Sequence, residues 1–289
     1  MVMLEKTFVV LSYIASLVVN GLAASGVLSG QSIGEISDQF PTYVTPDGLT
    51  FAVWAVIYTL ELLLVVMQCS APDRIESLLQ QSCCLTGLSV RWRLVFAFSL
   101  NAIWLPIYVN LLFGWALLVI ILYLAFLFLV YVDLNTMTVD SFVQWVVYAA
   151  GIACNVSWVL VATAANKFTF LGELGWKDVY GVAGTPAAAV LVVAVVASIA
   201  IIVAAARSDF AWSLVAVWAL AGLYRQQTIQ DPSSFPPEAM NPTLAKCALW
   251  AAIVVGLATF TGLLLVPFNG AFRSKRGDLT VAHKPLATE

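Results

Sequence analysis

Long apolar runs separated by short polar stretches are the main pattern along this chain. A helix needs roughly 20 apolar residues to cross about 30 Å of hydrocarbon. On that criterion the pattern predicts transmembrane helices over 7–28, 48–68, 93–112, 114–134, 141–166, 184–206, 210–226 and 245–267. We therefore expect an all-α integral membrane protein that crosses the bilayer about eight times.

The connections between these runs refine the picture. Only Phe113-Gly114 separates the third and fourth spans, which predicts a tight helical hairpin. The sixth span is rich in alanine, and small residues let helices approach closely in lipid. The proline-rich stretch 226–242 should be extended and non-helical. The first span also resembles a signal peptide, with a cleavage position near Ala23-Ala24, so its retention is left open.

Composition supports a membrane location. The chain is 62% apolar and 10% charged, whereas a soluble domain carries about 25% charged residues. So few charges cannot cover a water-exposed surface, which leaves the lipid bilayer as the covering medium. The net charge of −3 is thinly spread and indicates no nucleic-acid partner.

The basic residues of the loops predict the orientation. With eight spans, one side receives nine of them, namely Lys6, Arg74, Arg91, Arg93, Arg207, Arg273, Lys275, Arg276 and Lys284. The other side receives Lys167, Lys177, Arg225 and Lys246. This bias favours both termini on the cytoplasm-like side. It does not distinguish a plastid, a mitochondrial or a plasma membrane.

Metal and catalytic signatures are missing from the sequence. The five cysteines match no zinc or haem-attachment spacing. The single histidine, His283, lies in the polar tail, so no intramembrane histidine is present to ligate haem iron or a chlorophyll magnesium. The sequence contains no Walker loop, HExxH motif or Ser-His arrangement. No metal site is predicted, and an enzyme is the weaker hypothesis.

Seven of the ten tryptophans fall into two groups by position. Three lie at the ends of spans, as in the aromatic belts of membrane interfaces: Trp92, Trp115 and Trp176. Four lie inside spans: Trp54, Trp104, Trp158 and Trp218. An indole offers a broad flat face and one N–H donor. Interior tryptophans therefore suit either a planar ligand or simple packing.

Polar residues inside the spans are costly in hydrocarbon unless they find a partner. Asn101 and Trp104 are one helical turn apart, and Asn155, Trp158 and Asn166 follow one stripe. Trp54, Tyr58 and Glu61 are spaced by four and three residues on the second span. These faces indicate either a polar-lined cavity or hydrogen bonds between helices. The ligand-binding residues predicted from them are Trp54, Tyr58, Glu61, Asn101, Trp104, Trp158 and Asn166.

Glu61 is the only carboxyl group deep within a predicted span. Its functional interpretations are a proton site, a contact with a cation, or a partner for a ligand nitrogen. The structural interpretation is a glutamic acid that is hydrogen-bonded to a neighbouring helix. In either case Glu61 should face protein rather than lipid.

Three motifs resemble the tryptophan-rich sensory proteins, the TspO/MBR-related or translocator-protein family. The stretch VNGLAASGVLSGQSIGEISDQFPTYVTPDGLTFAVWAVIY has the family's late asparagine, its acidic and Ser-bearing loop, its TP step and F-x-x-W-x-x-x-Y. SLNAIWLPIY matches N-x-x-W, and SWVLVATAAN matches W-x-x-x-A-x-x-x-N. The resemblance covers roughly residues 7–170 and implies that the first span is retained.

The resemblance implies a five-helix core over 1–170, additional transmembrane helices over 171–270 as in longer members, and a polar C-terminal tail over 271–289. It also implies a cavity near the first loop that binds porphyrins or other tetrapyrroles, and a tendency to form homodimers. A porphyrin or pigment would not be His-ligated within the membrane here. Two residues depart from the family pattern: Glu61 stands at a usually small or apolar position, and Asn155 at one that is often aromatic.

Two functions remain open on these observations. The first is a ligand-binding, transport or sensory protein for a tetrapyrrole or another hydrophobic planar molecule. The second is a structural subunit of a larger membrane complex, photosynthetic or respiratory, that has lost the ligand role; the two departures favour this reading. Degradation of porphyrins by the interior tryptophans is a third reading that rests on analogy alone.

Overall fold

The computed structural model of the chain describes residues 2–135, 141–229 and 234–278, with the backbone alone for 265–278. Within these residues every regular element is helical, and only isolated β-bridges occur outside the helices. Seven helical segments of the described chain are long and apolar enough to cross a membrane. The protein is therefore all-α and multi-pass, which confirms the predicted fold class.

The seven segments follow the predicted runs closely. They are α1 (Val2–Ala24), Gly48–Ser70 with α3 (Val53–Met67) at its centre, α5 (Val90–Val109), α6 (Phe113–Asn135), Phe142–Glu173, α9 (Pro186–Arg207) and Pro242–Leu264 of α11 (Pro242–Asp278). The second segment consists of α3 flanked by two 3-10 turns, η1 (Gly48–Ala52) and η2 (Gln68–Ser70). The fifth segment consists of α7 (Phe142–Trp145), the π-helical turn η3 (Val146–Ala150) and α8 (Gly151–Glu173). The remaining predicted span, the seventh in chain order, forms α10 (Phe210–Gln226), which has 17 residues. At 1.5 Å per residue α10 is about 26 Å long, which is short but within the range of transmembrane helices.

Side-chain caps set where several helices begin. Ser89 accepts a hydrogen bond from the backbone N–H of Trp92 and starts α5 three residues before the predicted position 93. Thr185 and Asp209 cap α9 and α10 in the same way. The α5–α6 turn lies at Asn110–Leu112, slightly before the predicted Phe113-Gly114. Such caps satisfy backbone donors that would otherwise have no partner.

Two short helices were missed because they are too short and too polar to resemble a span. α2 (Ile33–Gln39) begins at a capping box in which Ser32 N–H donates to Glu35 Oε2 at 2.6 Å and Glu35 N–H donates to Ser32 Oγ at 3.2 Å. The S-x-x-E spacing of such a box is visible in the sequence. The second missed helix, α4 (Asp73–Leu79), lies between α3 and α5 in the chain. The stretch 226–242, predicted to be extended and non-helical, contains one short 3-10 turn, η4 (Pro237–Ala239).

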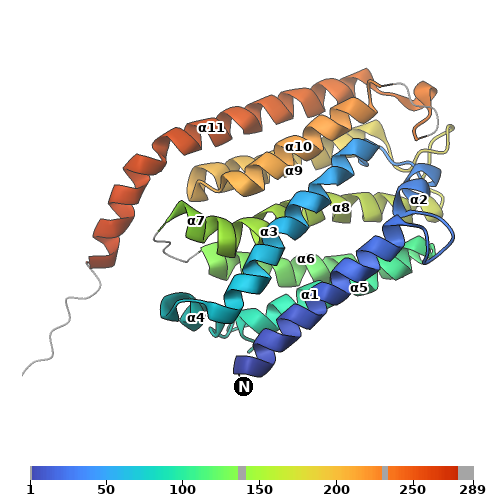
Figure 1. Cartoon of the computed structure of the whole chain (residues 1–289). Helices are drawn as coiled ribbons and strands as arrows, with labels where there is room; N and C mark the ends of the chain where they lie inside the picture. The colour runs from blue at the N-terminus through green and yellow to red at the C-terminus, as the bar shows by residue number, and fades with distance from the viewer. Residues whose placement is uncertain (1, 136–140, 230–233, 279–289) are drawn as a thin grey trace, which may run out of the picture.

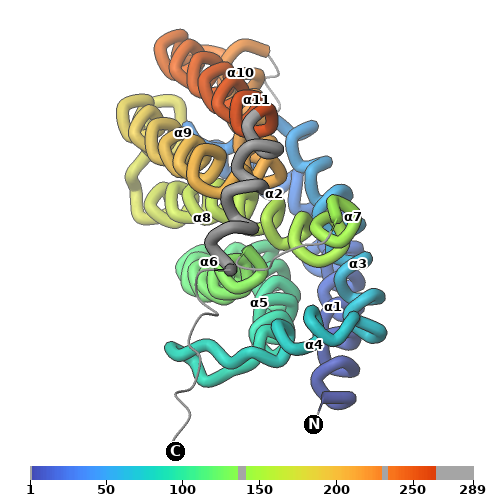
Figure 2. The backbone as a smooth tube through the Cα atoms, turned by 90° about the vertical axis from the view of Figure 1, so that its left-hand side faces the viewer, coloured from blue at the N-terminus to red at the C-terminus, as the bar shows by residue number. Residues whose placement is uncertain are grey.

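The helices run between two ends of one bundle, with α2 at one end and α4 and the N-terminus at the other (Figure 1). α8 lies in the middle and contacts α3, α6 and α10. α9, α10 and α11 stand together on one side of α8, and α1, α5 and α6 on the other (Figure 2). The predicted division near residue 170 would separate these two groups and stays a prediction. The backbone of α11 is helical through Asp278, beyond the predicted start of a tail at 271, and residues 279–289 lie outside the described residues.

A buried ionic cluster fills the α4 end of the bundle. The guanidinium of Arg91 donates to both carboxylate oxygens of Glu76 at 2.7 Å and to Gln68 Oε1 at 2.8 Å. Lys6 Nζ lies 3.1 Å from the same carboxylate, and Arg93 pairs with Asp133. Arg91 and Arg93, predicted as loop charges, are fully buried at the start of α5. These bidentate and charge-assisted bonds offset the cost of burying the two guanidinium groups.

If α10 crosses the membrane as the seven longer segments do, the eight crossings place the two ends of the chain on the same side. Epitope tags fused before Met1 and after Glu289 should therefore have the same accessibility in sealed vesicles. Tags found on opposite sides would mean that α10 does not cross the membrane.

The ionic cluster should make stability depend on pH in the acid range. Hydrogen bonds from Arg91 hold the pKa of Glu76 at about 2, below its ordinary value of 4.5. Because the pKa is lowered in the folded state, the charged carboxylate stabilises the fold above about pH 4.5, and this contribution is lost as the pH falls toward 2. In detergent, Tm of the wild type should fall more steeply across this window than that of Glu76→Gln. Glu238→Gln, an exposed residue of η4, should keep the wild-type slope.

Candidate functional site

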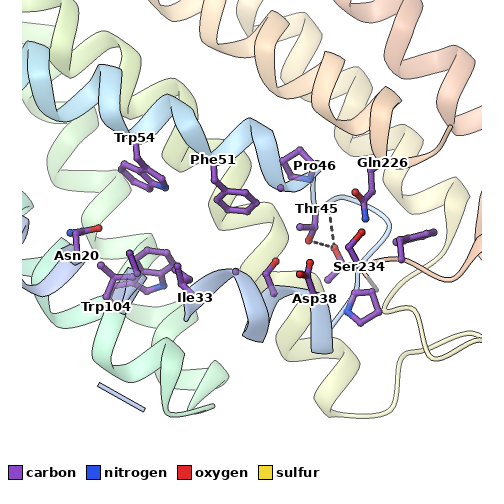
Figure 3. Close-up of a pocket in the computed structure, with 18 of the residues that line it drawn as sticks. Asn20, Ile33, Asp38, Thr45, Pro46, Phe51, Trp54, Trp104, Gln226 and Ser234 are labelled. Carbon is purple, nitrogen blue, oxygen red and sulfur yellow. Dashed lines mark hydrogen bonds between the residues drawn. The ribbon is translucent and has the colours of Figure 1, made fainter. Parts of the chain in front are cut away.

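A cavity of about 420 Å³ lies at the α2 end of the bundle. Its walls come from α1, α2, α3 and α5, from the loop 41–48, from the last residue of α10, and from Ser234 and Phe235. Figure 3 shows Trp54 and Phe51 facing Trp104 at one end, while Thr45, Asp38 and Gln226 gather at the other. The cavity is therefore aromatic at one end and polar at the other.

Packing among rings holds the aromatic end rigid. Trp54 stacks on Tyr58 with ring centroids 5.3 Å apart and an interplanar angle of 15°. Behind them Trp158 meets Trp54 and Phe51 edge-on, at 6.2 Å and 5.6 Å. Trp158 itself is buried and does not line the cavity. It supports the rings that do.

Trp104 is oriented by a hydrogen bond rather than by stacking alone. Its indole Nε1–H donates to Asn166 Oδ1 at 3.0 Å, and Asn166 Nδ2 donates to the carbonyl of Ala162 at 2.9 Å. Asn166 thus lies behind Trp104 and fixes one edge of its ring beside the cavity. The amide and the indole come from α8 and α5, which is the inter-helix pairing expected of polar groups in lipid.

Two amide side chains, those of Asn20 and Asn101, lie at the aromatic end of the cavity, where Figure 3 shows Asn20. Asn20 lines the cavity, and its Nδ2 donates to Asn101 Oδ1 at 2.7 Å. Asn101 Oδ1 also accepts from Ser16 Oγ at 2.6 Å. The hydroxyl of Tyr58 donates to Asn20 Oδ1 at 2.5 Å, and that of Tyr13 to the carbonyl of Tyr58. These bonds join α1, α3 and α5 where the cavity ends.

Glu61 lies outside the cavity, farther along α3 and enclosed by α6 and α8. It is 1% exposed, so it faces protein as expected. Asn155 Nδ2 donates to Glu61 Oε1 at 2.5 Å and to the hydroxyl of Tyr123 at 2.7 Å. α8 can approach this closely because residue 151 is glycine. A Cβ on Gly151 would come within 2.8 Å of the backbone nitrogen of Glu61.

The two departures from the family pattern are therefore partners of each other. Glu61 brings an acid into the bundle, and Asn155 supplies the amide that pairs with it. Glu61 without Asn155 would be a buried acid without this partner, which costs about 1–3 kcal/mol, whereas Asn155 without Glu61 would keep its bond to Tyr123. This contact gives both departures a structural reason that does not involve a ligand.

The predicted site residues thus fall into three groups. Trp54, Tyr58 and Trp104 line the cavity. Asn101, Trp158 and Asn166 contact lining residues from behind. Glu61 belongs to a separate buried cluster. Trp218, an interior tryptophan by sequence, is half-exposed on α10 and donates its indole N–H to the carbonyl of Thr50.

The polar end of the cavity was not predicted, since its residues come from four separate segments. α2 contributes Asp38, the first loop Thr45, α10 Gln226 and the segment before η4 Ser234. The only signal in the sequence was the acidic and Ser-bearing character of the first loop. Among the described residues, no group of three or more His, Cys, Asp or Glu side chains could hold a metal ion.

The loop over the polar end is tied to the loop after α8. The hydroxyl of Tyr43 donates to Asp178 Oδ2 at 2.5 Å, and burial raises the pKa of Tyr43. The backbone N–H of Ala183 donates to the carbonyl of Pro41 at 2.9 Å, and that of Tyr43 to the carbonyl of Ala183 at 3.2 Å. These contacts fix the first loop without using the side chains that line the cavity.

The Glu61–Asn155 pair generates a stability prediction. Asn155→Leu leaves the buried Glu61 without its amide partner and should destabilise the protein by about 1–3 kcal/mol. Glu61→Leu should cost less than that, because Asn155 keeps its bond to Tyr123, and Glu61→Gln should cost least because it keeps a hydrogen-bonding group. The double variant Glu61→Leu/Asn155→Leu should cost less than the sum of the two single changes, because the acid is removed together with its amide partner, while the Tyr123 hydroxyl loses its bond equally in both variants that lack Asn155. Reversible unfolding in detergent measures the stability of the wild type, the three single variants and the double variant. Additive effects would show that the two residues do not depend on each other.

Comparison with known proteins places the chain in a family. A family model described as TSPO-like protein matches residues 6–261, a region that contains the whole cavity. A search of curated proteins and a search of solved structures each found no match. The matched region also covers both the predicted five-helix core and most of the additional helices. On this match, which spans most of the sequence, the chain belongs to the TSPO-like protein family.

Proposed function

We propose that the protein binds a planar, largely apolar small molecule in this cavity and carries or senses it within the membrane. The observation that carries the proposal is the cavity of about 420 Å³ that Trp54 and Trp104 line at its aromatic end (Figure 3). Ligand pockets are commonly about 300–1,000 Å³, mostly apolar, with a few polar groups that fix orientation. This cavity has both features.

The support behind the two tryptophans favours binding by pre-organised stacking. Tyr58 and Trp158 hold the ring of Trp54, and Asn166 holds that of Trp104. A ligand that enters between rings already fixed in place causes little further loss of side-chain freedom. Flat faces without a demand for particular hydrogen bonds suit a planar conjugated body.

A tetrapyrrole is the candidate that the family resemblance implies. Such a ligand would be held by stacking and shape, because no histidine is among the described residues that line the cavity. A metal-free porphyrin should then bind as well as its metal complex. Comparing the two affinities distinguishes binding by stacking from binding through an axial ligand to the metal.

The proposal can be tested by substituting the tryptophans that line the cavity. Trp54→Ala and Trp104→Ala should each weaken binding of an uncharged planar probe such as pyrenemethanol by about threefold to tenfold, since one aromatic pair contributes about 0.5–1.5 kcal/mol. Fluorescence titration of the protein in nanodiscs measures the affinity.

Trp115→Ala is the matched control, because Trp115 is 65% exposed on α6 and does not line the cavity. It should bind the probe like the wild type. Equal affinities for all four proteins would place the probe elsewhere. Absence of binding in the wild type, with co-migration of the protein in a larger complex, would favour a structural subunit instead.

A further inference from the structure

An open groove of about 390 Å³ lies between α9 and α11, apart from the candidate cavity. Both helices begin at the α2 end of the bundle (Figure 1), and they lie side by side (Figure 2). The lining residues come from the first three turns of the two helices, as far as Ala194 of α9 and Ala251 of α11. The groove therefore follows the two helices inward from one membrane surface.

Small side chains make the groove hollow. Ala194 and Ala251 line it, and a larger side chain at either position would fill part of its space. Trp250 adds a flat wall and is 63% exposed. Because α9 and the described part of α11 both lie in membrane-spanning segments, the groove opens to lipid. An apolar hollow of this kind can take a flexible acyl chain.

The outer part of the groove is basic. Of the described residues that line it, Lys246 is the only charged one, and Thr243 adds a hydroxyl one turn earlier. Among the described residues, no hydrogen bond or ion pair engages the ammonium of Lys246. Lys246 lies four residues after the start of α11, about 6 Å along the helix, so its long side chain can reach the level of the lipid headgroups. Trp250 lies one turn deeper.

We propose that this groove binds one anionic phospholipid of the surrounding bilayer, with its phosphate at Lys246 and Thr243 and an acyl chain in the hollow between Ala194 and Ala251. The ammonium would pair with a phosphate oxygen, and the hydroxyl would donate to another. The groove shares no lining residue with the candidate cavity, so this inference is independent of the ligand bound there.

The charge of the groove selects among the possible occupants. A zwitterionic lipid carries a cationic group as well as a phosphate, and no acid among the described lining residues receives that cation. An anionic lipid is therefore favoured. A second copy of the chain is a poorer occupant, because a two-fold contact through this surface would bring two Lys246 ammonium groups together.

Quenching of Trp250 by brominated lipids tests the inference at the groove itself. The full chain is placed in nanodiscs of phosphatidylcholine, and increasing fractions of phosphatidylglycerol or phosphatidylcholine with one brominated acyl chain are added. The signal of Trp250 is the difference between each protein and its Trp250→Phe counterpart. Phosphatidylglycerol should associate about threefold to tenfold more strongly than phosphatidylcholine, and this ratio should shrink as salt is raised.

Lys246→Gln should bring the ratio of the two association constants close to one, because the attraction for the phosphate is lost. Lys167→Gln is the matched control. Lys167 is an exposed lysine of α8, lies within two turns of the end of that helix, and does not line the groove. This control should keep the wild-type ratio.

Ala194→Phe tests whether the acyl chain occupies the hollow. The added ring fills the groove but leaves Lys246 in place, so the preference for phosphatidylglycerol should fall by about threefold. Ala205→Phe is the matched control, since Ala205 is an exposed alanine of the same helix, three turns farther along and outside the groove. It should behave like the wild type.

Equal association of the two lipids with the wild type would overturn the inference, and so would a preference that persists in Lys246→Gln. A preference unchanged in Ala194→Phe would mean that the lysine attracts headgroups without a lipid in the groove, which also overturns it. Cross-linking of two chains through this surface, with no quenching of Trp250 by either lipid, would assign the groove to a second copy instead. Each of these outcomes leaves pyrenemethanol binding in the cavity unaffected.

Discussion

α3 is held from two sides by buried hydrogen bonds, and the direction in which it presents its aromatic residues depends on them. Tyr58 bonds to Asn20 of α1, and Glu61 bonds to Asn155 of α8. In hydrocarbon a polar group without a partner is costly, so these bonds exclude other rotations of the helix. With the rotation set, Trp54 faces the cavity and Glu61 faces α8. The aromatic end of the candidate site is a consequence of this constraint.

Charged residues are arranged differently at the two ends of the bundle. At the α4 end, Arg91 and Arg93 are buried and paired with carboxylates, which closes the bundle. At the α2 end the ion pair of Arg225 with Asp47 lies beside the cavity, and Asp38 remains the charged lining residue among the described part of the chain. Of these two ends, the α2 end holds the cavity. The candidate site therefore lies at the end whose paired arginine is the more exposed.

The transmembrane helices could be predicted from the sequence because each is marked by a continuous local run of apolar residues. An apolar run of about 20 residues has few stable alternatives to a helix in lipid, so the spans and their order could be predicted from hydropathy. α10 was placed correctly although it is short, since its ends are polar. α2 and α4 were missed because helices of seven residues leave little periodic signal, although the capping box at Ser32 was legible. The burial of Arg91 was missed because its partner Glu76 lies 15 residues earlier, across a turn of the chain.

For the site, the sequence by itself determined which residues share a helical face: Trp54 with Tyr58, and Asn101 with Trp104. The tertiary structure decided which of these faces meet. It placed Trp158 behind Trp54 rather than in the cavity, and it assembled the polar end from segments nearly 200 residues apart, Asp38 to Ser234. Helical periodicity is a property of neighbouring residues, whereas these contacts depend on how helices rotate and pack against one another. That packing is settled by the pairing of buried polar groups across helices, which no single stretch of sequence contains.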